Sequence, residues 1–248
     1  MLYSSFSILF YLLFTSLLLL TISFSEEPIF FSYLYFTGLS GFRIYKDGEN
    51  TIKVACVGDS VTYGYGITGW RTNNYPYYLG KLLGEEYTVN NYGLSGYSVQ
   101  TDSNKPYPFS SPYKKSLEFD PDIVVFMLGS NDSKPLNWKG EEKFKKEYLS
   151  LLETYKDSSV ILCTVATAFY NGSQESGITS YNIQPPVIDK ISEIIREVAD
   201  EYGYPLLDIH ALTSLHPEWF QDDRVHPNKE GAKAIAEVVA EYILSLEI

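Results

Sequence analysis

The sequence predicts an α/β fold in which a parallel β-sheet is covered by helices on both faces. From residue 51 onward, short apolar runs alternate with longer helix-like segments, as in strands joined by crossover helices. The run Ile-Val-Val-Phe-Met-Leu at 123–128 is continuously apolar, which is typical of a strand buried on both faces. A length of 248 residues suits one such domain plus a short extra segment.

The elements follow one another in a regular order. The expected strands cover residues 52–57, 88–91, 122–128, 160–165 and 206–209. The expected helices cover residues 74–86, 141–155, 182–202 and 229–246. The last two helices repeat apolar residues at spacings of three and four, which places an apolar stripe on one side of each.

The first 25 residues form a hydrophobic segment without any charged residue. Its length fits the core of a signal peptide or a membrane anchor, and Ser23 and Ser25 are placed like the small residues of a cleavage site. No Lys or Arg occurs before Arg43, which argues against cleavage. We expect residues 26–50 to be a linker or juxtamembrane segment and residues 51–248 to be a domain secreted or anchored outside the cytoplasm. A hydrophobic arm packed on the fold is the alternative.

Composition argues against nucleic acid as a partner, against a disulfide framework and against a zinc site. The net charge of −12 repels phosphate backbones, so nucleic acid is not an expected partner. Cys56 and Cys163 each lie in an apolar run and are expected to be buried thiols rather than a disulfide framework. No Cys/His cluster has zinc-ligand spacing, and we expect neither a metal nor a cofactor.

Polar residues follow the expected strands, where a parallel sheet places its active site. Ser60 follows the first strand, Gly96 follows the second and Asn131 follows the third. A loop after the last strand carries Asp223 and His226.

These residue types suit acyl transfer, which needs a nucleophile, a base and donors for an oxyanion. Ser60 can be the nucleophile, His226 the base, and Asp223 the carboxylate that orients the imidazole. The backbone N–H groups of Ser60 and Gly96 and the side-chain amide of Asn131 can form the oxyanion hole. Gly96 has no side chain, so a substrate oxygen can approach its N–H closely.

Taken together and in this order, the four blocks resemble the SGNH (GDSL) hydrolase family over residues 52–246. The resemblance implies a serine esterase without a metal, built as a three-layer α/β/α sandwich around a doubly wound, flavodoxin-like, five-stranded parallel sheet. The sequences of residues 58–64 and 128–138 are similar to those of bacterial carbohydrate O-acetylesterases, including sialate O-acetylesterase-like proteins. That similarity implies a glycan or small-molecule ester, with acetyl as the acyl group.

Competing assignments exist for the base and its carboxylate. His210 and His216 lack an aspartate three residues earlier, which favours His226. Asp222 competes with Asp223 and has the less suitable spacing.

Other residues of the same blocks have structural alternatives. Ser60 could cap a helix after a strand, and Asn131 could merely hold its loop. Asp59 and Asp132 are expected to lie behind the catalytic residues and to brace the loops. Tyr63 and Trp138 could line the acyl or sugar pocket, or could simply be packed aromatic residues.

Rival functions remain open to different degrees. Residues 64–69 match the GxGxxG pattern of dinucleotide-binding proteins, but the match does not start at a strand end and no acidic residue closes the second strand. A lysophospholipase, a thioesterase or a transacylase could use the same serine. A non-catalytic carbohydrate-binding protein is a more remote alternative, because it needs no nucleophile.

Overall fold

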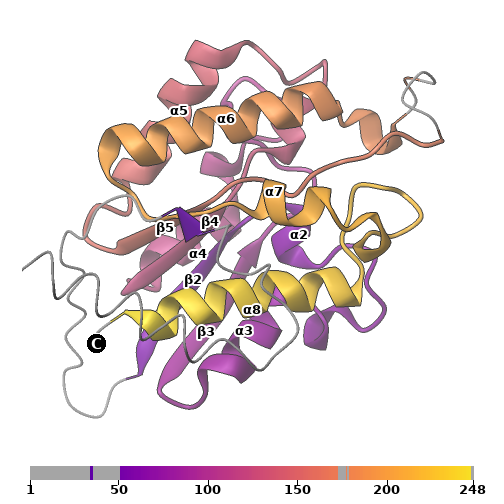
Figure 1. The fold of residues 1–248 in the computed structure, drawn as a ribbon. Helices are drawn as coiled ribbons and strands as arrows, with labels where there is room; N and C mark the ends of the chain where they lie inside the picture. Colours follow the sequence, from indigo (N-terminus) through magenta and orange to yellow (C-terminus); the bar gives the residue numbers. More distant parts are fainter. Residues whose placement is uncertain (1–33, 36–50, 173–176, 178, 247–248) are drawn as a thin grey trace, which may run out of the picture. The chain divides into compact units, whose positions relative to one another are not determined.

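A computed structural model describes residues 34–35, 51–172, 177 and 179–246. Their centre is a six-stranded sheet in the order β1-β6-β5-β4-β2-β3 (Figure 1). Its strands are β1 (Leu34–Tyr35), β2 (Ile52–Gly58), β3 (Tyr87–Gly93), β4 (Ile123–Met127), β5 (Ser159–Cys163) and β6 (Leu206–Leu207). Strands β2 to β6 are parallel, and β1 pairs antiparallel with β6. The five parallel strands have the order of a doubly wound, flavodoxin-like sheet, so this prediction is confirmed.

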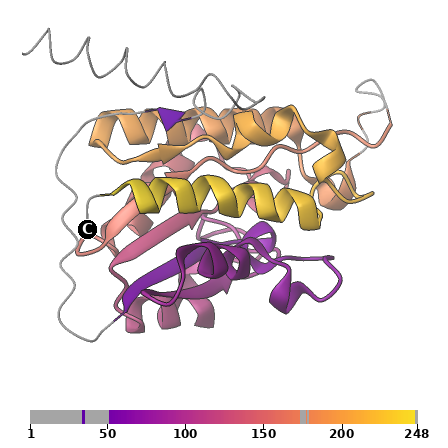
Figure 2. The same ribbon diagram turned by 60° about the horizontal axis from the view of Figure 1, so that its bottom comes forward.

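Helices cover both faces of this sheet, as expected (Figure 2). They are α2 (Ser60–Tyr63), α3 (Tyr75–Leu83), α4 (Ser111–Glu118), α5 (Glu141–Glu153), α6 (Pro185–Tyr202), α7 (Ile209–Ser214) and α8 (Lys229–Ser245). Helices α3 and α8 pack on each other over one face, and α5 and α6 pack on each other over the opposite face. Short 3-10 turns include η2 (Trp70–Thr72), η4 (Ser130–Ser133) and η6 (Ser180–Asn182).

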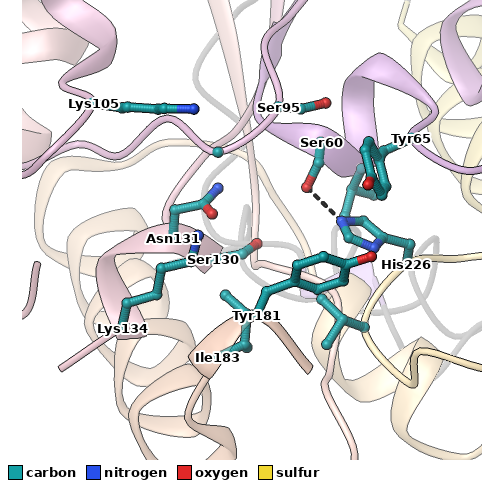
Figure 3. A pocket seen from close by; sticks show the side chains of 13 residues that line it. Ser60, Tyr65, Ser95, Lys105, Ser130, Asn131, Lys134, Tyr181, Ile183 and His226 are labelled. Carbon is teal, nitrogen blue, oxygen red and sulfur yellow. Dashed lines mark hydrogen bonds between the residues drawn. The ribbon is translucent and has the colours of Figure 1, made fainter. Parts of the chain in front are cut away.

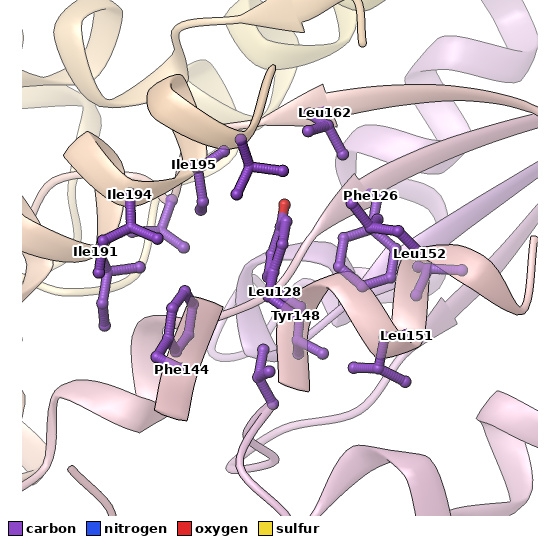
Figure 4. Close-up of a cluster of buried hydrophobic side chains, with 14 of the residues drawn as sticks. Phe126, Leu128, Phe144, Tyr148, Leu151, Leu152, Leu162, Ile191, Ile194 and Ile195 are labelled. Carbon is purple, nitrogen blue, oxygen red and sulfur yellow. The ribbon is translucent and has the colours of Figure 1, made fainter. Parts of the chain in front are cut away.

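The core has two parts because neighbouring residues of each strand point to opposite faces of the sheet. On β4, Val124 and Phe126 face the α5–α6 side, whereas Val125 and Met127 face the α3–α8 side. Figure 4 shows the first side, where Tyr148 of α5 lies against Phe126 with ring centroids 5.3 Å apart. Both faces of β4 are thus covered, as its unbroken apolar sequence predicts.

The expected elements differ from the observed ones mainly at their ends. The helix expected to reach residue 86 ends at Leu83, because Gly84 adopts a left-handed φ of 80° and the next strand begins at Tyr87. Helix α4 was not predicted, although Ser110 accepts a hydrogen bond as its N-cap. Strand β1 comes from the segment expected to be a linker.

The N-terminal hydrophobic segment, residues 1–25, lies outside the described residues. None of the helices built from the described residues combines the length and the apolar character that a bilayer crossing requires.

Three strands end at the same level of the sheet. Gly58 of β2 is the register partner of Gly93 on β3 and of Met127 on β4. The segments that follow these three residues therefore leave the sheet side by side. The order of the strands reverses direction at β2, which is where a doubly wound sheet places its binding crevice.

Candidate active site

Ser60 lies at the turn from β2 into α2 and is the first residue of that helix. Asp59 caps the helix, because its Oδ1 accepts a hydrogen bond from the N–H of Val61 at 3.0 Å. The Ser60 side chain is largely buried, with 7% of the residue exposed. The cap is provided by the neighbouring aspartate, which leaves the Ser60 hydroxyl available for another contact.

The other contact is His226, which connects Ser60 to Asp223. The Nε2 atom of His226 lies 2.9 Å from the Oγ of Ser60 (Figure 3). Its Nδ1 atom lies 2.7 Å from the Oδ2 of Asp223. Because a carboxylate can only accept, the ring carries its proton on Nδ1, and Nε2 is then an acceptor for the serine hydroxyl.

Asp223 also fixes the backbone of the residue that it contacts. Its Oδ1 accepts hydrogen bonds from the backbone N–H groups of His226 at 2.9 Å and Val225 at 3.0 Å. Partial burial acts to raise the pKa of Asp223, but the hydrogen bonds from the ring and backbone of His226 outweigh it and hold the pKa below its usual value. Asp223 is therefore ionised at neutral pH and favours one tautomer of the imidazole.

A cavity of about 310 Å³ opens over these residues. Ser60, Gly96, Asn131 and His226 all line it, although they come from four separate segments of the chain. Figure 3 shows the side chains of Ser60, Asn131 and His226 around this cavity. Its volume lies at the small end of the range for ligand pockets.

Gly96 and Asn131 are held beside each other. The side-chain amide of Asn131 donates a hydrogen bond to the carbonyl of Tyr97 at 3.0 Å, which leaves its second N–H for another acceptor. Gly96 has a φ of 88°, a left-handed conformation that favours glycine. The two groups can therefore present N–H donors to one oxygen in the cavity.

Two buried carboxylates connect the loops behind the cavity. Asp59 connects the turn after β2 to η4, and Asp132 connects η4 to the loop after β3. The Oδ2 of Asp59 accepts from the N–H of Ser130 at 3.2 Å. Asp132 accepts from the N–H groups of Val99 at 2.8 Å and Gln100 at 2.9 Å. Burial raises the pKa of both carboxyls, with opposing contributions from these N–H groups, and the pKa of Asp132 is about 7. Both residues lie behind the cavity wall and hold the loops in place.

The two aromatic residues considered for the pocket lie elsewhere. Tyr63 stacks on Trp70 with ring centroids 4.3 Å apart. Trp138 packs towards Phe144 of α5 with ring centroids 6.1 Å apart. Neither residue is among those that line the cavity, so the packing alternative describes both better.

The competing histidines have contacts of their own. His210 Nε2 lies 3.1 Å from Asp189, and His216 Nδ1 lies 2.8 Å from Glu218. Neither histidine lines the cavity over Ser60.

The cavity-lining residues that were not predicted include two tyrosines and two lysines. Tyr65 and Tyr181 flank the His226 ring, with centroids 4.7 Å and 5.2 Å from it. Lys105 and Lys134 border the side where Asn131 lies (Figure 3). Lys134 follows Asn131 by three residues and could have been considered from its position, whereas Tyr181 belongs to a loop without a recognisable motif.

Among the residues that the structure describes, no group of three or more His, Cys, Asp and Glu side chains is arranged to hold a metal ion.

Comparison with known proteins adds independent information. Residues 56–234 match the sequence model of the GDSL-like lipase/acylhydrolase family. The chain is 34% identical over 217 residues to an acetylxylan esterase of Xylanibacter ruminicola, covering 79% of this chain and 44% of that protein. It is 25% identical over 238 residues to a multidomain esterase of Ruminococcus flavefaciens, covering 80% of this chain and 29% of that protein. The chain thus spans less than half the length of these two relatives.

Solved structures share the fold at lower identity. A carbohydrate acetylesterase family member from Sinorhizobium meliloti matches with a TM-score of 0.62 and 20% identity, over 79% of this chain and 99% of that one. A lipase/acylhydrolase from Enterococcus faecalis matches with a TM-score of 0.63 and 21% identity, over 78% of this chain and 95% of that one.

Proposed function

Because the chain belongs to the GDSL-like lipase/acylhydrolase family, we propose that it is a serine esterase that hydrolyses acetyl esters of a carbohydrate. The observation that carries this proposal is the hydrogen-bonded row from Ser60 through His226 to Asp223, with separations of 2.9 Å and 2.7 Å. A serine beside an oriented imidazole and an ionised carboxylate is the arrangement that nucleophilic catalysis on an ester needs.

The first half of the reaction forms an acyl-enzyme. His226 takes the proton of the Ser60 hydroxyl as the oxygen attacks the ester carbonyl. The imidazolium that forms is stabilised by Asp223 through Nδ1–H. The developing oxyanion accepts hydrogen bonds from the N–H groups of Ser60 and Gly96 and from the amide of Asn131. His226 then gives its proton to the leaving alcohol.

The second half releases the acid. A water molecule enters after the alcohol has left, and His226 removes a proton from it as it attacks the acyl-enzyme. The same donors hold the second oxyanion. Collapse of this intermediate returns the proton to Ser60 and restores the starting state.

Two observations favour acetyl as the acyl group. The cavity volume of about 310 Å³ is small for a long acyl chain. A relative with 34% identity is called an acetylxylan esterase. A series of p-nitrophenyl esters from acetate to octanoate tests the choice: we expect kcat/KM to fall as the chain lengthens. A rise with chain length would instead favour a lysophospholipase or thioesterase.

The substitution Ser60→Ala tests the nucleophile. We expect kcat with p-nitrophenyl acetate to fall roughly 10⁴- to 10⁶-fold, because no acyl-enzyme can form. Mass spectrometry after treatment with a fluorophosphonate should find the adduct on Ser60 in the wild type and none in the variant. Full activity of a correctly folded Ser60→Ala protein would contradict the assignment.

We also propose that residues 1–25 direct the domain out of the cytoplasm, by secretion or by anchoring. The absence of charge over that segment supports this proposal. Cell fractionation tests it, and recovery of the full-length chain in the soluble cytosolic fraction would contradict it.

A further inference from the structure

The wall of the candidate active site carries an unexpected charge. The chain as a whole has 31 Asp and Glu against 19 Lys and Arg. The cavity over Ser60 is nevertheless lined by Lys105 and Lys134, and no Asp or Glu is among its lining residues. The charge of the cavity wall is thus opposite in sign to the net charge of the molecule.

The two lysines come from different segments and converge on one side of the cavity. Lys105 lies in the loop before α4, and Lys134 follows η4. Figure 3 shows both side chains on the side of Asn131, opposite Tyr65. A Cβ atom placed on Gly96 would lie 3.6 Å from the Nζ of Lys105, so this ammonium borders the segment proposed to hold the oxyanion.

Neither lysine has an anionic partner in the described part of the chain. Lys53, Lys143, Lys145 and Lys190 all form ion pairs there, whereas Lys105 and Lys134 form none. Asp59 attracts Lys134 from behind the wall, but its carboxylate is already used by Val61 and Ser130.

Two ammonium groups that share one cavity wall repel each other. Half-burial lowers the pKa of Lys134; Asp59 opposes this effect and repulsion from Lys105 adds to it. Two like charges that line one cavity without a protein counter-charge are stabilised when an anion binds between them. A carboxylate of the substrate, bound beside the two ammonium groups, would supply this counter-charge.

We propose that Lys105 and Lys134 bind an anionic group of the substrate, so that the enzyme prefers acetylated sugars that carry a carboxylate, such as O-acetylated uronic acids. This inference rests on the proposed acetylesterase function and specifies its substrate class. The ester itself is placed at Ser60, and the carboxylate lies on the Asn131 side of the cavity. Because Lys105 is exposed, its attraction is partly screened, and a moderate rather than an absolute preference follows.

A matched pair of substrates tests this proposal. Methyl 3-O-acetylglucopyranoside and methyl 3-O-acetylglucopyranosiduronate differ only in the group at C6, which is neutral in one and a carboxylate in the other at pH 7. We expect the wild type to hydrolyse the uronate with a kcat/KM about tenfold higher, mainly through a lower KM. Raising NaCl from 0.05 to 0.5 M should reduce that ratio.

Substitutions assign the preference to the two lysines. Lys105→Gln and Lys134→Gln should each lower the ratio about threefold, and the double variant should bring it close to one. Lys105→Arg keeps the charge and should keep most of the preference. Lys114→Gln is the matched control, because Lys114 is an exposed lysine of α4 that does not line the cavity, and it should leave the ratio unchanged.

The possible outcomes separate this inference from the proposed function. Equal kcat/KM values of the wild type for the two esters would overturn the inference and leave the acetylesterase function intact. An equal loss on both esters in the Gln variants would also overturn it, because the lysines would then act on the oxyanion that both reactions share. Hydrolysis of p-nitrophenyl acetate but of neither sugar ester would overturn the inference alone, whereas failure on p-nitrophenyl acetate as well would overturn the proposed function.

Discussion

At the scale of single residues, Asp223 uses both carboxylate oxygens on His226: one accepts from the ring and the other from the backbone N–H. In Asp223→Asn the amide has only one oxygen. It must either turn its NH₂ towards Nδ1, which favours the wrong tautomer, or lose its backbone hydrogen bonds. We expect kcat to fall roughly 10²- to 10⁴-fold with p-nitrophenyl acetate.

The neighbouring Asp222 provides a control for that substitution. Asp222 is exposed, and Asp222→Asn removes the same charge one residue away. We expect it to change kcat less than twofold. If the two variants had similar activity, Asp223 would not be the residue that orients His226.

Asp132 gives a prediction about pH. Burial raises its pKa from 3.8 to about 7, against the opposing hydrogen bonds from Val99 and Gln100. The folded protein therefore holds this proton more tightly than the unfolded chain, so the contribution to stability is complete below pH 3.8 and is lost as the pH rises towards 7.

Comparison with Asp132→Asn isolates this effect, because Asp59 titrates in both proteins. We expect the free energy of unfolding of the wild type, minus that of the variant, to fall by more than about 1 kcal/mol between pH 4 and pH 7. Urea denaturation at a series of pH values measures it. A difference that stays constant or increases with pH would show that the Asp132 pKa is not raised.

At the scale of secondary-structure elements, α2 lies very close to the end of β3. A Cβ atom on Gly93 would contact the backbone nitrogen of Tyr63 and lie 2.7 Å from the carbonyl carbon of Thr62. Backbone atoms cannot move aside without displacing α2, which carries Ser60. We therefore expect Gly93→Ala to destabilise the fold by more than about 2 kcal/mol and to lower kcat of any folded fraction.

Gly80 is the matched control for Gly93. It lies within α3, where an added Cβ would meet only Val89 at an ordinary contact distance of 3.5 Å. Gly80→Ala should be neutral or stabilise the protein by up to about 1 kcal/mol, because alanine favours a helix. Thermal unfolding of both variants measures the contrast, and an equal loss in both would contradict the proposed close approach.

The sequence predicted the elements that bury the largest apolar surfaces. Continuous apolar runs identified β2, β4 and β5 because both faces of these strands are covered, and apolar stripes identified α6 and α8. Helix α4 was missed because only Ser116 is buried in it, which leaves almost no apolar periodicity. Apolar runs and stripes in the sequence therefore identify the elements that bury apolar side chains, and they miss an element that buries few.

The site could be predicted to the extent that its residues follow strands. Ser60, Gly96 and Asn131 lie after strand ends in register, so topology alone brings them together. Tyr181 could not be predicted, because it reaches His226 from a loop and has a left-handed φ of 58° that no local pattern specifies. The charge of the cavity wall was hidden for a related reason, since Lys105 comes from a loop whose path depends on tertiary contacts.

For the molecule as a whole, the two core clusters and the cavity are built entirely from residues between 52 and 243. We therefore expect a chain that lacks residues 1–32 to fold, to unfold in one cooperative transition and to hydrolyse p-nitrophenyl acetate.

Removing residues 1–50 also deletes β1, which pairs with β6 at only two positions, Leu34 with Leu207 and Tyr35 with Leu206. This second chain should keep its kcat within twofold, because β6 lies three strands away from β2. It should aggregate more readily, because the edge of β6 is then open to pairing with another chain. Circular dichroism, light scattering and kcat measure these outcomes, and loss of cooperative unfolding on removal of residues 1–32 would contradict the expectation that the later residues fold independently.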